Sequence, residues 1–265
     1  MVAIEKYATL SEAANVVANG ARYFGGGTLI MRALNYAEEG YERLVLADDP
    51  ALRTIARERD QLVLGSGVTM AQVVRSPEAE FLSSVARAVG GPAIRSAATV
   101  GGNLFAEHPY GDFSVALLAL DATVSISGGA RIELEQFLAG RANFSGIVES
   151  VTAKIPERTS FRFKKVSRVK PKGVSVMSIA SWLPQSGGRI SGARITFGAM
   201  GPTPLRAKGV EQTLEGGNLD ETTVDRAVAQ LTNDLQPFDD PIASAWYRRE
   251  VAPVHLKRLL LERNY

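Results

Sequence analysis

The segment Ile-Arg-Ser-Ala-Ala-Thr-Val-Gly-Gly-Asn-Leu, residues 94–104, is the most informative stretch of this chain. Its two adjacent glycines, Gly101 and Gly102, lack a Cβ, so their main-chain N–H groups can approach a ligand closely. Thr99 and Asn103 add side-chain hydrogen-bonding groups on either side. The glycines also predict a turn-rich run from residue 94 to residue 105. We therefore treat this segment as a candidate ligand-binding loop.

Asp112 follows this segment and directly precedes an apolar helix predicted over residues 113–120. Its carboxylate can accept a hydrogen bond from a ribose or ribityl hydroxyl. Alternatively, Asp112 caps the helix, a position where aspartate is common. His108 lies in the same loop, where we expect its side chain to form a hydrogen bond.

A second glycine cluster lies upstream, in Tyr-Phe-Gly-Gly-Gly-Thr-Leu-Ile, residues 23–30. A short predicted strand leads into it, and Thr28 is predicted to cap the helix that follows. Three glycines remove every Cβ, and a helix start adds unpaired N–H groups, so a pyrophosphate is the natural ligand. The alternative is a tight strand-to-helix turn that binds nothing.

Two other patterns exclude common functions. Gly65-Ser66-Gly67 matches half of a dinucleotide fingerprint, but Met70 stands where the third glycine belongs, so we predict only a turn. The chain has no Gly-Lys-Ser/Thr sequence, which excludes a P-loop, and no Gly-x-Ser-x-Gly sequence, which excludes the commonest hydrolase site.

Composition narrows the function further. Thirty Lys and Arg residues against 28 Asp and Glu residues give a formal charge of +2, which predicts no basic face for nucleic acid. Zero cysteines exclude disulfides and an iron–sulfur cluster held by this chain, and two histidines leave little for a metal site. No apolar stretch approaches the roughly 20 residues of a membrane span. The first residues do not resemble a secretory signal, so we expect a cytoplasmic protein.

Hydrophobic periodicity predicts an α+β protein, because hairpins and helices interleave without regular βαβ alternation. Thr9 and Glu12 predict a capping box at the first helix. The main domain boundary is predicted near residues 156–160. The predicted elements that bear on this organisation are hairpins over residues 52–64 and 122–134 and a helix from residue 220. Residues 161–166, 174–183 and 190–199 are predicted to form long strands or a strand–helix–strand mixture.

These elements together resemble the flavin-binding medium subunit of the molybdenum hydroxylases, the family of xanthine dehydrogenase and carbon monoxide dehydrogenase. The resemblance covers nearly the whole chain. Residues 25–28 resemble the family's Ala-Gly-Gly-Thr-Asp-Leu loop, and residues 94–104 resemble its Ile-Arg-Asn-x-Ala-Thr-Ile-Gly-Gly-Asn-Leu loop. Further similar segments are Pro109 to Asp112, Phe163 to Arg168, Ala199 to Arg206 and Tyr247 to Arg249.

The resemblance implies a two-subdomain FAD-binding (PCMH-type) fold over residues 1–157, with subdomains of about 1–56 and 57–157. A C-terminal α+β domain with an antiparallel sheet and helices would follow over residues 158–265. It also implies non-covalent FAD, no catalytic acid or base, and no metal site in this chain. The cofactor-binding residues that it implies are Phe24, Gly25, Gly26, Gly27, Thr28, Leu29, Val89, Thr99, Val100, Gly101, Gly102, Asn103, Asp112, Lys165 and Val174.

By the same resemblance, the chain passes electrons from a 2Fe-2S small subunit to NAD, a quinone or oxygen. A large molybdopterin subunit completes a heterotrimer, expected to form a dimer of heterotrimers. The chain departs from the family pattern at Leu29, at Glu107-His108 and at Pro253, which is expected to interrupt the last helix. Two alternatives therefore stay open: a free-standing FAD-dependent oxidase or cyclase, and a scaffold that has lost FAD.

Overall fold

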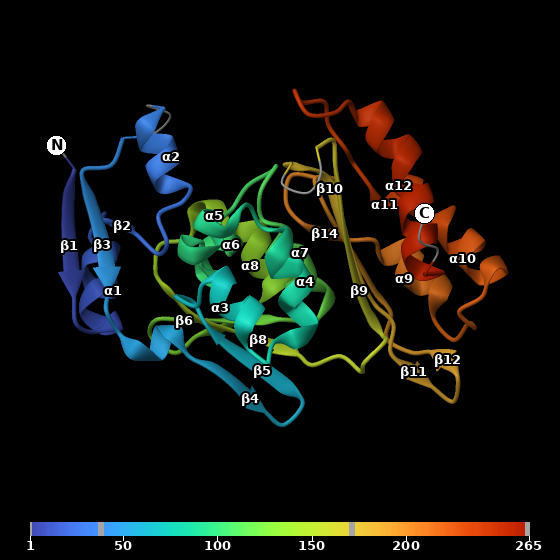
Figure 1. Ribbon diagram of the computed structural model, residues 1–265, viewed down its shortest axis with the longest axis horizontal. Coiled ribbons are helices and arrows are strands. Elements are labelled where there is room, and N and C mark those ends of the chain that lie inside the picture. The colour runs from blue at the N-terminus through green and yellow to red at the C-terminus, as the bar shows by residue number, and fades with distance from the viewer. Residues whose placement is uncertain (1, 37–39, 170–172, 263–265) are drawn as a thin grey trace. The chain divides into compact units, whose positions relative to one another are not determined.

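A computed structural model describes residues 2–36, 40–169 and 173–262 of the chain (Figure 1). Contacts within the chain divide it into two compact units. The first unit contains the residues up to Ala106 and the segment Ala122–Lys154, and the second contains Glu107–Asp121 and the residues from Ile155 onward. The segment Glu107–Asp121 thus groups with the second unit, although it precedes the boundary predicted near residues 156–160.

The first unit begins with a three-stranded parallel sheet of order β1-β3-β2. The capping box predicted for its first helix is confirmed, because the Thr9 side chain accepts from the Glu12 N–H and the Glu12 side chain accepts from the Thr9 N–H. Leu10 and Val17 of this helix are buried in one cluster with Val45 of the sheet. The elements of this part are β1 (Ala3–Tyr7), α1 (Leu10–Ala18), β2 (Arg22–Tyr23), α2 (Ile30–Asn35), β3 (Arg43–Ala47) and η1 (Pro50–Arg53).

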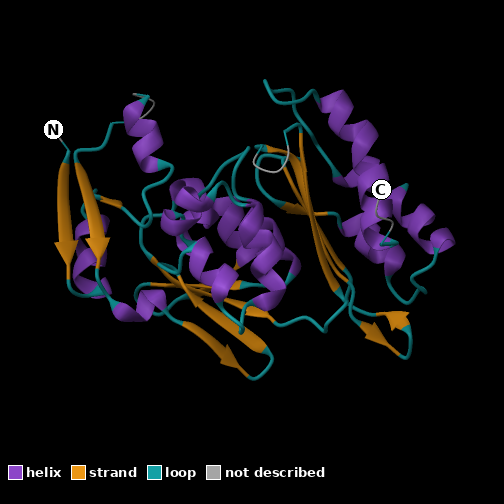
Figure 2. Cartoon of the chain, viewed as in Figure 1, coloured by secondary structure: helices purple, strands orange, loops and turns teal. Residues whose placement is uncertain are grey.

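The rest of the first unit is a five-stranded antiparallel sheet of order β4-β5-β8-β6-β7. Both predicted hairpins are confirmed, since β4 pairs with β5 and β6 pairs with β7. Figures 1 and 2 show the helices of this part over one face of the sheet. The elements are β4 (Ile55–Glu58), β5 (Gln61–Gly65), α3 (Met70–Arg75), η2 (Glu80–Leu82), α4 (Ser83–Ala88), α5 (Pro92–Ala97), α6 (Val100–Leu104), β6 (Thr123–Ile126), β7 (Arg131–Glu133), α8 (Leu134–Gly140), η3 (Arg141–Asn143) and β8 (Val148–Lys154).

The prediction of a turn-rich run over residues 94–105 is wrong, because two short helices, α5 and α6, occupy this stretch. Pro92 is the first residue of α5, where its fixed φ and missing N–H are tolerated. Thr99 caps α6 by accepting the Gly102 N–H with its side chain. The cap and the packing around α6 outweigh the low helix propensity of Gly101 and Gly102.

The second unit contains a four-stranded antiparallel sheet of order β14-β13-β10-β9 and a separate two-stranded hairpin, β11-β12. No helix in the described parts of either unit is long and apolar enough to cross a membrane. The elements of the second unit are α7 (Asp112–Ala119), β9 (Phe161–Ser167), β10 (Ser175–Trp182), β11 (Gln185–Ser186), β12 (Arg189–Ile190), β13 (Arg194–Gly198), β14 (Leu205–Arg206), α9 (Lys208–Leu214), α10 (Glu221–Val228), α11 (Leu231–Asp234) and α12 (Ala245–Leu260).

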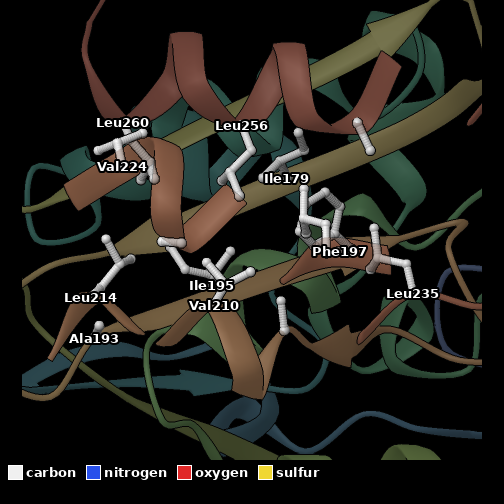
Figure 3. Packing of buried hydrophobic residues seen from close by; sticks show 14 of the residues in the cluster. Ile179, Ala193, Ile195, Phe197, Val210, Leu214, Val224, Leu235, Leu256 and Leu260 are labelled. Carbon is white, nitrogen blue, oxygen red and sulfur yellow. The ribbon is translucent and has the colours of Figure 1, made fainter. Parts of the chain in front are cut away.

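Nearly every residue of strands β10 and β13 is buried, because both faces of these strands are covered. Because side chains alternate between the faces of a strand, Ile179 and Phe197 lie in the apolar core shared with the C-terminal helices (Figure 3). On the other face small residues allow α7 to pack closely. A Cβ on Gly198 would lie 2.8 Å from Val115 of α7, so only glycine fits this position without a shift.

The expectation that Pro253 interrupts the last helix is wrong, because α12 continues through this residue. Proline in a helix interior removes one main-chain hydrogen bond and adds a steric clash. The buried side chains of Ala252, Leu256 and Leu260 hold α12 in the core on both sides of the proline. Tertiary packing therefore offsets the local cost.

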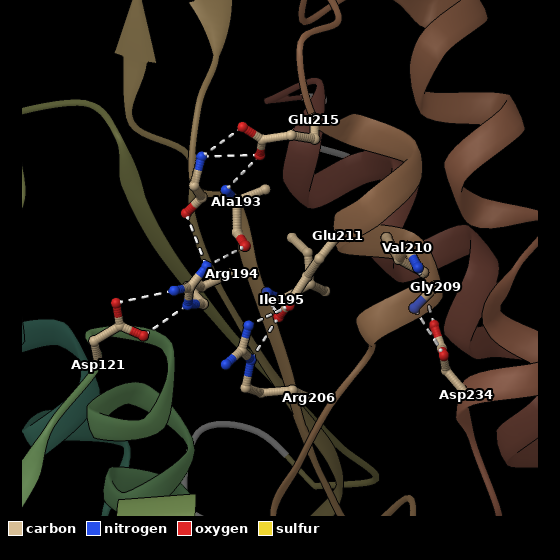
Figure 4. A network of polar contacts seen from close by, with 11 residues as sticks. Asp121, Ala193, Arg194, Ile195, Arg206, Gly209, Val210, Glu211, Glu215 and Asp234 are labelled. Carbon is tan, nitrogen blue, oxygen red and sulfur yellow. Dashed lines mark hydrogen bonds and ion pairs between the residues drawn. The ribbon is translucent and has the colours of Figure 1, made fainter. Parts of the chain in front are cut away.

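Carboxylates of the second unit bind main-chain N–H groups and arginines at the ends of its elements (Figure 4). Asp234 accepts from Gly209 N (2.9 Å) and Val210 N (3.0 Å) at the start of α9. Asp121, just after α7, forms an ion pair of 2.6 Å with Arg194 at the start of β13. The Asp234 contacts hold the start of α9 to α11, and the Asp121 ion pair holds the end of α7 to β13.

Candidate functional site

The first glycine loop, residues 24–29, joins β2 to α2 and presents main-chain N–H groups that lack an acceptor. Phe24 N still donates to Val45 O, at 2.7 Å. Among the described residues, none accepts a hydrogen bond from the N–H groups of residues 25–29. Because main-chain N–H groups require an acceptor, this row of donors is available to solvent or to an anionic ligand.

Thr28 does not have the capping role that the sequence predicted, and that prediction is wrong. The N-cap residue of α2 is Leu29, whose backbone is already helical, and no side chain caps the helix. Gly27 turns the chain instead, with φ of +71°, and a Cβ there would lie 2.2 Å from the Phe24 ring. The turn is therefore made by glycine, and the described residues provide no hydrogen-bond partner for the Thr28 hydroxyl.

The two glycine loops, far apart in sequence, lie against each other in the first unit. A Cβ on Gly25 would be 3.1 Å from Thr99 Oγ1, and a Cβ on Gly26 would be 1.8 Å from the carbonyl oxygen of Ala97. The second distance is shorter than any real contact, and the obstructing atom belongs to the main chain. Only glycine at position 26 lets the two loops meet in this way.

The donor set of the first loop fits a dinucleotide diphosphate. Such a group carries two negative charges and is bound by several N–H donors at close range, commonly from glycine-rich loops. Residues 25–29 provide consecutive N–H donors for which no described residue is an acceptor, and the glycines at 25–27 carry no side chains. The loop is also half-exposed rather than buried, so a ligand can reach it.

The second glycine loop is organised differently, because its N–H groups already have acceptors within the chain. Val100 N donates to Val68 O and Gly101 N donates to Ser66 O, both at 2.8 Å, while Gly102 N donates to Thr99 Oγ1 at 3.0 Å and Asn103 N to Thr99 O at 3.0 Å. The visible role of this loop is to support the first loop. Direct binding of a ligand by residues 99–103 stays a prediction.

Ser66 is a residue whose importance the sequence did not reveal. The turn predicted at Gly65-Ser66-Gly67 is confirmed, and its glycines pack against the Leu52 carbonyl. The Ser66 carbonyl receives the Gly101 N–H, and a Cβ on Gly101 would lie 2.8 Å from the Ser66 Cβ. A turn dismissed as a ligand site therefore positions the second glycine loop.

Asp112, in the second unit, is buried with only 5% of its surface exposed. Its Oδ1 accepts from Ser175 Oγ at 2.6 Å, and its Oδ2 pairs with Lys165 Nζ at 2.9 Å. The N-cap residue of α7 is Gly111, at φ of 87°, and Asp112 is the first helical residue. The alternative that Asp112 serves as the helix cap is therefore wrong. Each carboxylate oxygen retains a further acceptor site for a ligand hydroxyl.

The remaining predicted site residues lie in both units. Lys165 is on β9, and Val174 immediately precedes Ser175 at the start of β10, with 36% of its surface exposed. Val89 is the C-cap residue of α4 in the first unit. Arg95 Nη1 donates to the carbonyl groups of the turn that follows, at 2.5 Å from Gly90 O. The structure gives these residues defined positions, and their contact with a cofactor stays a prediction.

Asp112→Ala is expected to lower the free energy of unfolding by about 2 kcal/mol, because it removes a buried carboxylate that forms an ion pair with Lys165 and accepts a hydrogen bond from Ser175. Urea unfolding of the full chain measures this change. Asp225→Ala removes an exposed partner of Lys257 and should change stability by less than about 0.5 kcal/mol. If Asp112→Ala/Lys165→Met is no more stable than Asp112→Ala, the loss does not come from the broken ion pair between Asp112 and Lys165.

His108 belongs to a second polar cluster of the same unit. His108 Nε2 lies 2.5 Å from Asp240 Oδ2, so the expectation of a hydrogen-bonding loop histidine is confirmed in kind, but the partner is 132 residues away. Arg248 is fully buried and donates to Asp240 at 2.8 Å and to Val176 O at 2.9 Å. Burial lowers the pKa of His108, although the hydrogen bond to Asp240 opposes this shift.

The carboxylate of Asp240 makes stability depend on acid pH. Burial alone would raise its pKa, but hydrogen bonds from the Ala243 N–H and from Arg248 outweigh it and lower the pKa to about 2. A depressed folded-state pKa contributes stability above the unfolded-state value near 4 and loses it as pH falls toward 2. Between pH 4 and pH 2, urea midpoints should fall less steeply for Asp240→Asn than for the unmodified chain; equal slopes would contradict this assignment.

No group of three or more histidine, aspartate or glutamate side chains in the described part of the chain is arranged to hold a metal ion. The chain also contains no cysteine.

Two family models match this chain and together span almost all of it. Residues 2–155 match the model described as the FAD binding domain in molybdopterin dehydrogenase. Residues 161–263 match the model described as the carbon monoxide dehydrogenase flavoprotein C-terminal domain. The matched ranges meet in the region of the predicted domain boundary.

Two relatives match over most of their length. The chain is 25% identical over 272 residues to the xanthine dehydrogenase FAD-binding subunit of Escherichia coli O157:H7, covering 96% of this chain and 93% of the relative. It is 28% identical to the carbon monoxide dehydrogenase medium chain of Afipia carboxidovorans, with coverage of 90% and 87%. The solved carbon monoxide dehydrogenase of Hydrogenophaga pseudoflava shares the fold, with a TM-score of 0.90, 20% identity and coverage of 98% and 96%.

Proposed function

Because this chain belongs to the family of FAD-binding domains in molybdopterin dehydrogenases, we propose that it transfers electrons as the medium subunit of a three-subunit hydroxylase. It is an FAD-binding oxidoreductase subunit of the xanthine and carbon monoxide dehydrogenase type. The observation that most strongly supports FAD binding, on which this role depends, is the row of N–H groups at residues 25–29 that have no acceptor in the described part of the chain. It fits the diphosphate of a flavin dinucleotide.

In this proposal the first glycine loop binds the FAD diphosphate. The N–H groups of residues 25–29 donate to its oxygens, and hydrogen bonds to a charged acceptor are roughly twice as strong as neutral ones. Thr28 adds a hydroxyl, and the contact between Gly26 and Ala97 holds the loop in shape. When bound, FAD supplies the redox chemistry, and the protein binds and orients it.

The other proposed contacts complete the binding of the cofactor. Asp112 accepts a hydrogen bond from a cofactor hydroxyl while it stays paired with Lys165 and Ser175. The resemblance adds Val89 and Val174 as apolar contacts. Thr99 and the loop that it begins contribute to the same site, chiefly by supporting residues 25–27.

The absence of cysteine supports a division of labour between subunits. Iron–sulfur clusters are held by cysteine thiolates, which this chain does not contain. We assign the 2Fe-2S cluster to a small partner and the molybdopterin to a large one, in a dimer of heterotrimers. Electrons would enter from the cluster and leave to NAD, a quinone or oxygen. Both relatives described above are named as a subunit or chain of a dehydrogenase.

The test begins with the full chain produced alone. We expect yellow protein, with FAD released on denaturation in a ratio near one per chain, and protein freed of FAD should bind added FAD. Protein that binds no FAD would contradict the proposal and favour the scaffold alternative.

A second experiment tests the electron route. Produced with its partners, the chain should purify with a cysteine-rich small subunit, and its flavin should be reduced through that subunit when the substrate of the complex is added. Turnover of a substrate by this chain without partners would instead favour a free-standing oxidase or cyclase. Comparing flavin reduction by NADH with and without the partners shows whether NADH exchanges electrons with the flavin of this chain directly or only through another subunit.

A further inference from the structure

Helix α5 of the first unit lies directly before the second glycine loop, and none of its side chains is buried. Ile94, its largest apolar residue, has 44% of its surface exposed. Helices in proteins are held chiefly by an apolar face that packs against the core. Because α5 buries no such face, its position depends on hydrogen bonds and main-chain contacts.

The side chain of Arg95 ties α5 to the end of α4. Its Nη1 donates to three main-chain carbonyl groups, at 3.1 Å from Arg87 O, 3.5 Å from Val89 O and 2.5 Å from Gly90 O. The last carbonyl groups of a helix have no partner within the helix, and an arginine nearby can satisfy them. Within the described residues, no other side chain of α5 forms a hydrogen bond to another element.

The turn between α4 and α5 brings the two helices within reach of this contact. Gly90 has φ of +52°, in the region that favours glycine, and a Cβ there would lie 2.8 Å from Ile94 Cγ2. Val89, an apolar cofactor contact in the proposed function, is the C-cap residue of α4. The hydrogen bonds of Arg95 therefore hold this residue as well.

The other end of α5 contacts the first glycine loop. A Cβ on Gly26 would lie 1.8 Å from the carbonyl oxygen of Ala97, the last residue of α5, so the two main chains touch there. A Cβ on Gly25 would lie 3.1 Å from Thr99 Oγ1, just after the helix. The loop that carries the N–H groups of residues 25–29 therefore rests on the end of α5.

We propose that Arg95 is a positioning residue of the FAD site, because it fixes α5 and thereby the surface on which the first glycine loop rests. Its hydrogen bonds hold the Ala97 carbonyl in place, and the N–H groups of residues 25–29 then point toward one ligand. Since α5 buries no side chain, loss of these bonds disturbs the site without unfolding the unit. The inference rests on the proposed function, in which residues 25–29 bind the FAD diphosphate.

Arg95→Met tests this role, because it removes the guanidinium donor and keeps an unbranched side chain. We expect the full chain with this change to bind FAD about tenfold more weakly, as for the loss of one hydrogen bond from a charged group. The urea midpoint of the FAD-free protein should stay close to that of the unmodified chain. Arg95→Lys, which keeps a charged donor, should recover part of the affinity. A lower urea midpoint with unchanged FAD affinity would overturn the proposal.

Arg87→Met is the matched control for the loss of positive charge. Arg87 is exposed in the last turn of α4, and its Nε donates to Ser83 Oγ of the same helix at 3.4 Å. The variant removes one charge near the turn but keeps the main-chain carbonyl that Arg95 binds. FAD affinity should be nearly unchanged, because salt screens an exposed charge. Equal losses in Arg87→Met and Arg95→Met would show that charge alone matters, and would overturn the positioning role.

Hydrogen exchange of the full chain freed of FAD tests whether Arg95 holds α5. The Ala98 N–H donates to Ile94 O at 2.7 Å at the end of this helix. A peptide covering residues 92–98 should exchange faster in Arg95→Met than in the unmodified chain. A peptide from β8, the central strand of its sheet, should exchange at the same rate in both. Unchanged exchange over residues 92–98 would overturn the inference.

The outcomes separate this inference from the proposed function. Unchanged FAD affinity in Arg95→Met, with FAD bound by the unmodified chain, overturns the role of Arg95 and leaves the proposed function intact. An unmodified chain that binds no FAD overturns the proposed function, and the role of Arg95 toward FAD falls with it, even if exchange over residues 92–98 shows that Arg95 holds α5.

Discussion

Gly26→Ala is expected to weaken FAD binding by at least about 100-fold, which corresponds to about 2.8 kcal/mol. The new Cβ would lie 1.8 Å from the Ala97 carbonyl oxygen, and a main-chain atom of a helix end cannot move aside as a flexible side chain can. The two glycine loops must separate, and the N–H groups of residues 25–29 then no longer point toward the same ligand. Equilibrium titration with FAD, followed by flavin fluorescence, measures the loss.

Gly140→Ala is the matched control for this change. It places the same methyl group at the end of α8, where nothing lies within 4 Å and the backbone conformation is ordinary. FAD affinity should be unchanged there. Normal FAD binding by Gly26→Ala would show that the contact between the loops is not needed, and the proposed diphosphate site would have to be abandoned.

Arg248→Met is expected to lower the free energy of unfolding by about 4 kcal/mol, the largest loss of stability that we predict. The guanidinium group is fully buried and binds three carbonyl groups, of Val176, Phe238 and Ala243, in addition to Asp240. Methionine fills much of the volume, but it leaves these three carbonyl groups without the guanidinium donor and removes the ion pair of Asp240. Urea unfolding and the thermal midpoint both measure the effect.

Arg249→Met provides the comparison, because Arg249 is the next residue of α12 and its side chain is exposed. Its loss should change stability by less than about 0.5 kcal/mol. Similar losses for the two variants would mean that the buried network around Arg248 contributes little. Replacing Asp240 together with Arg248 should recover part of the stability, since it removes the carboxylate that has lost its ion pair with Arg248.

The glycine loops could be predicted because their chemistry is local. Three adjacent glycines before a helix indicate bare main-chain donors whatever the rest of the fold does, and the capping box of Thr9 and Glu12 is equally local. The N–H groups of residues 100–103 were harder to interpret. Their acceptors include Ser66 and Val68, which a different segment supplies, and no pattern within the loop reveals this.

Polar pairs between residues far apart in the sequence account for most of the other differences between the predictions and the structure. Asp112 was an evident candidate for a helix cap, but Lys165 and Ser175 come from strands 53 and 63 residues further along the chain. His108 and Asp240 are more distant still. Pro253 was expected to interrupt its helix because local propensity says so, whereas the buried face of α12 decides the outcome. Sequence patterns thus predicted the elements better than their polar partners.

The placement of α7 affects any attempt to divide this chain for expression. A cut near residue 157 would leave α7 with the N-terminal fragment and remove it from β10 and β13, against which it packs. The C-terminal fragment would then expose the small, buried residues of that sheet face, and the N-terminal fragment would carry an apolar helix without its partner. Autonomous folding of the later half therefore requires grafting residues 107–121 onto it, for example by circular permutation, rather than simple truncation.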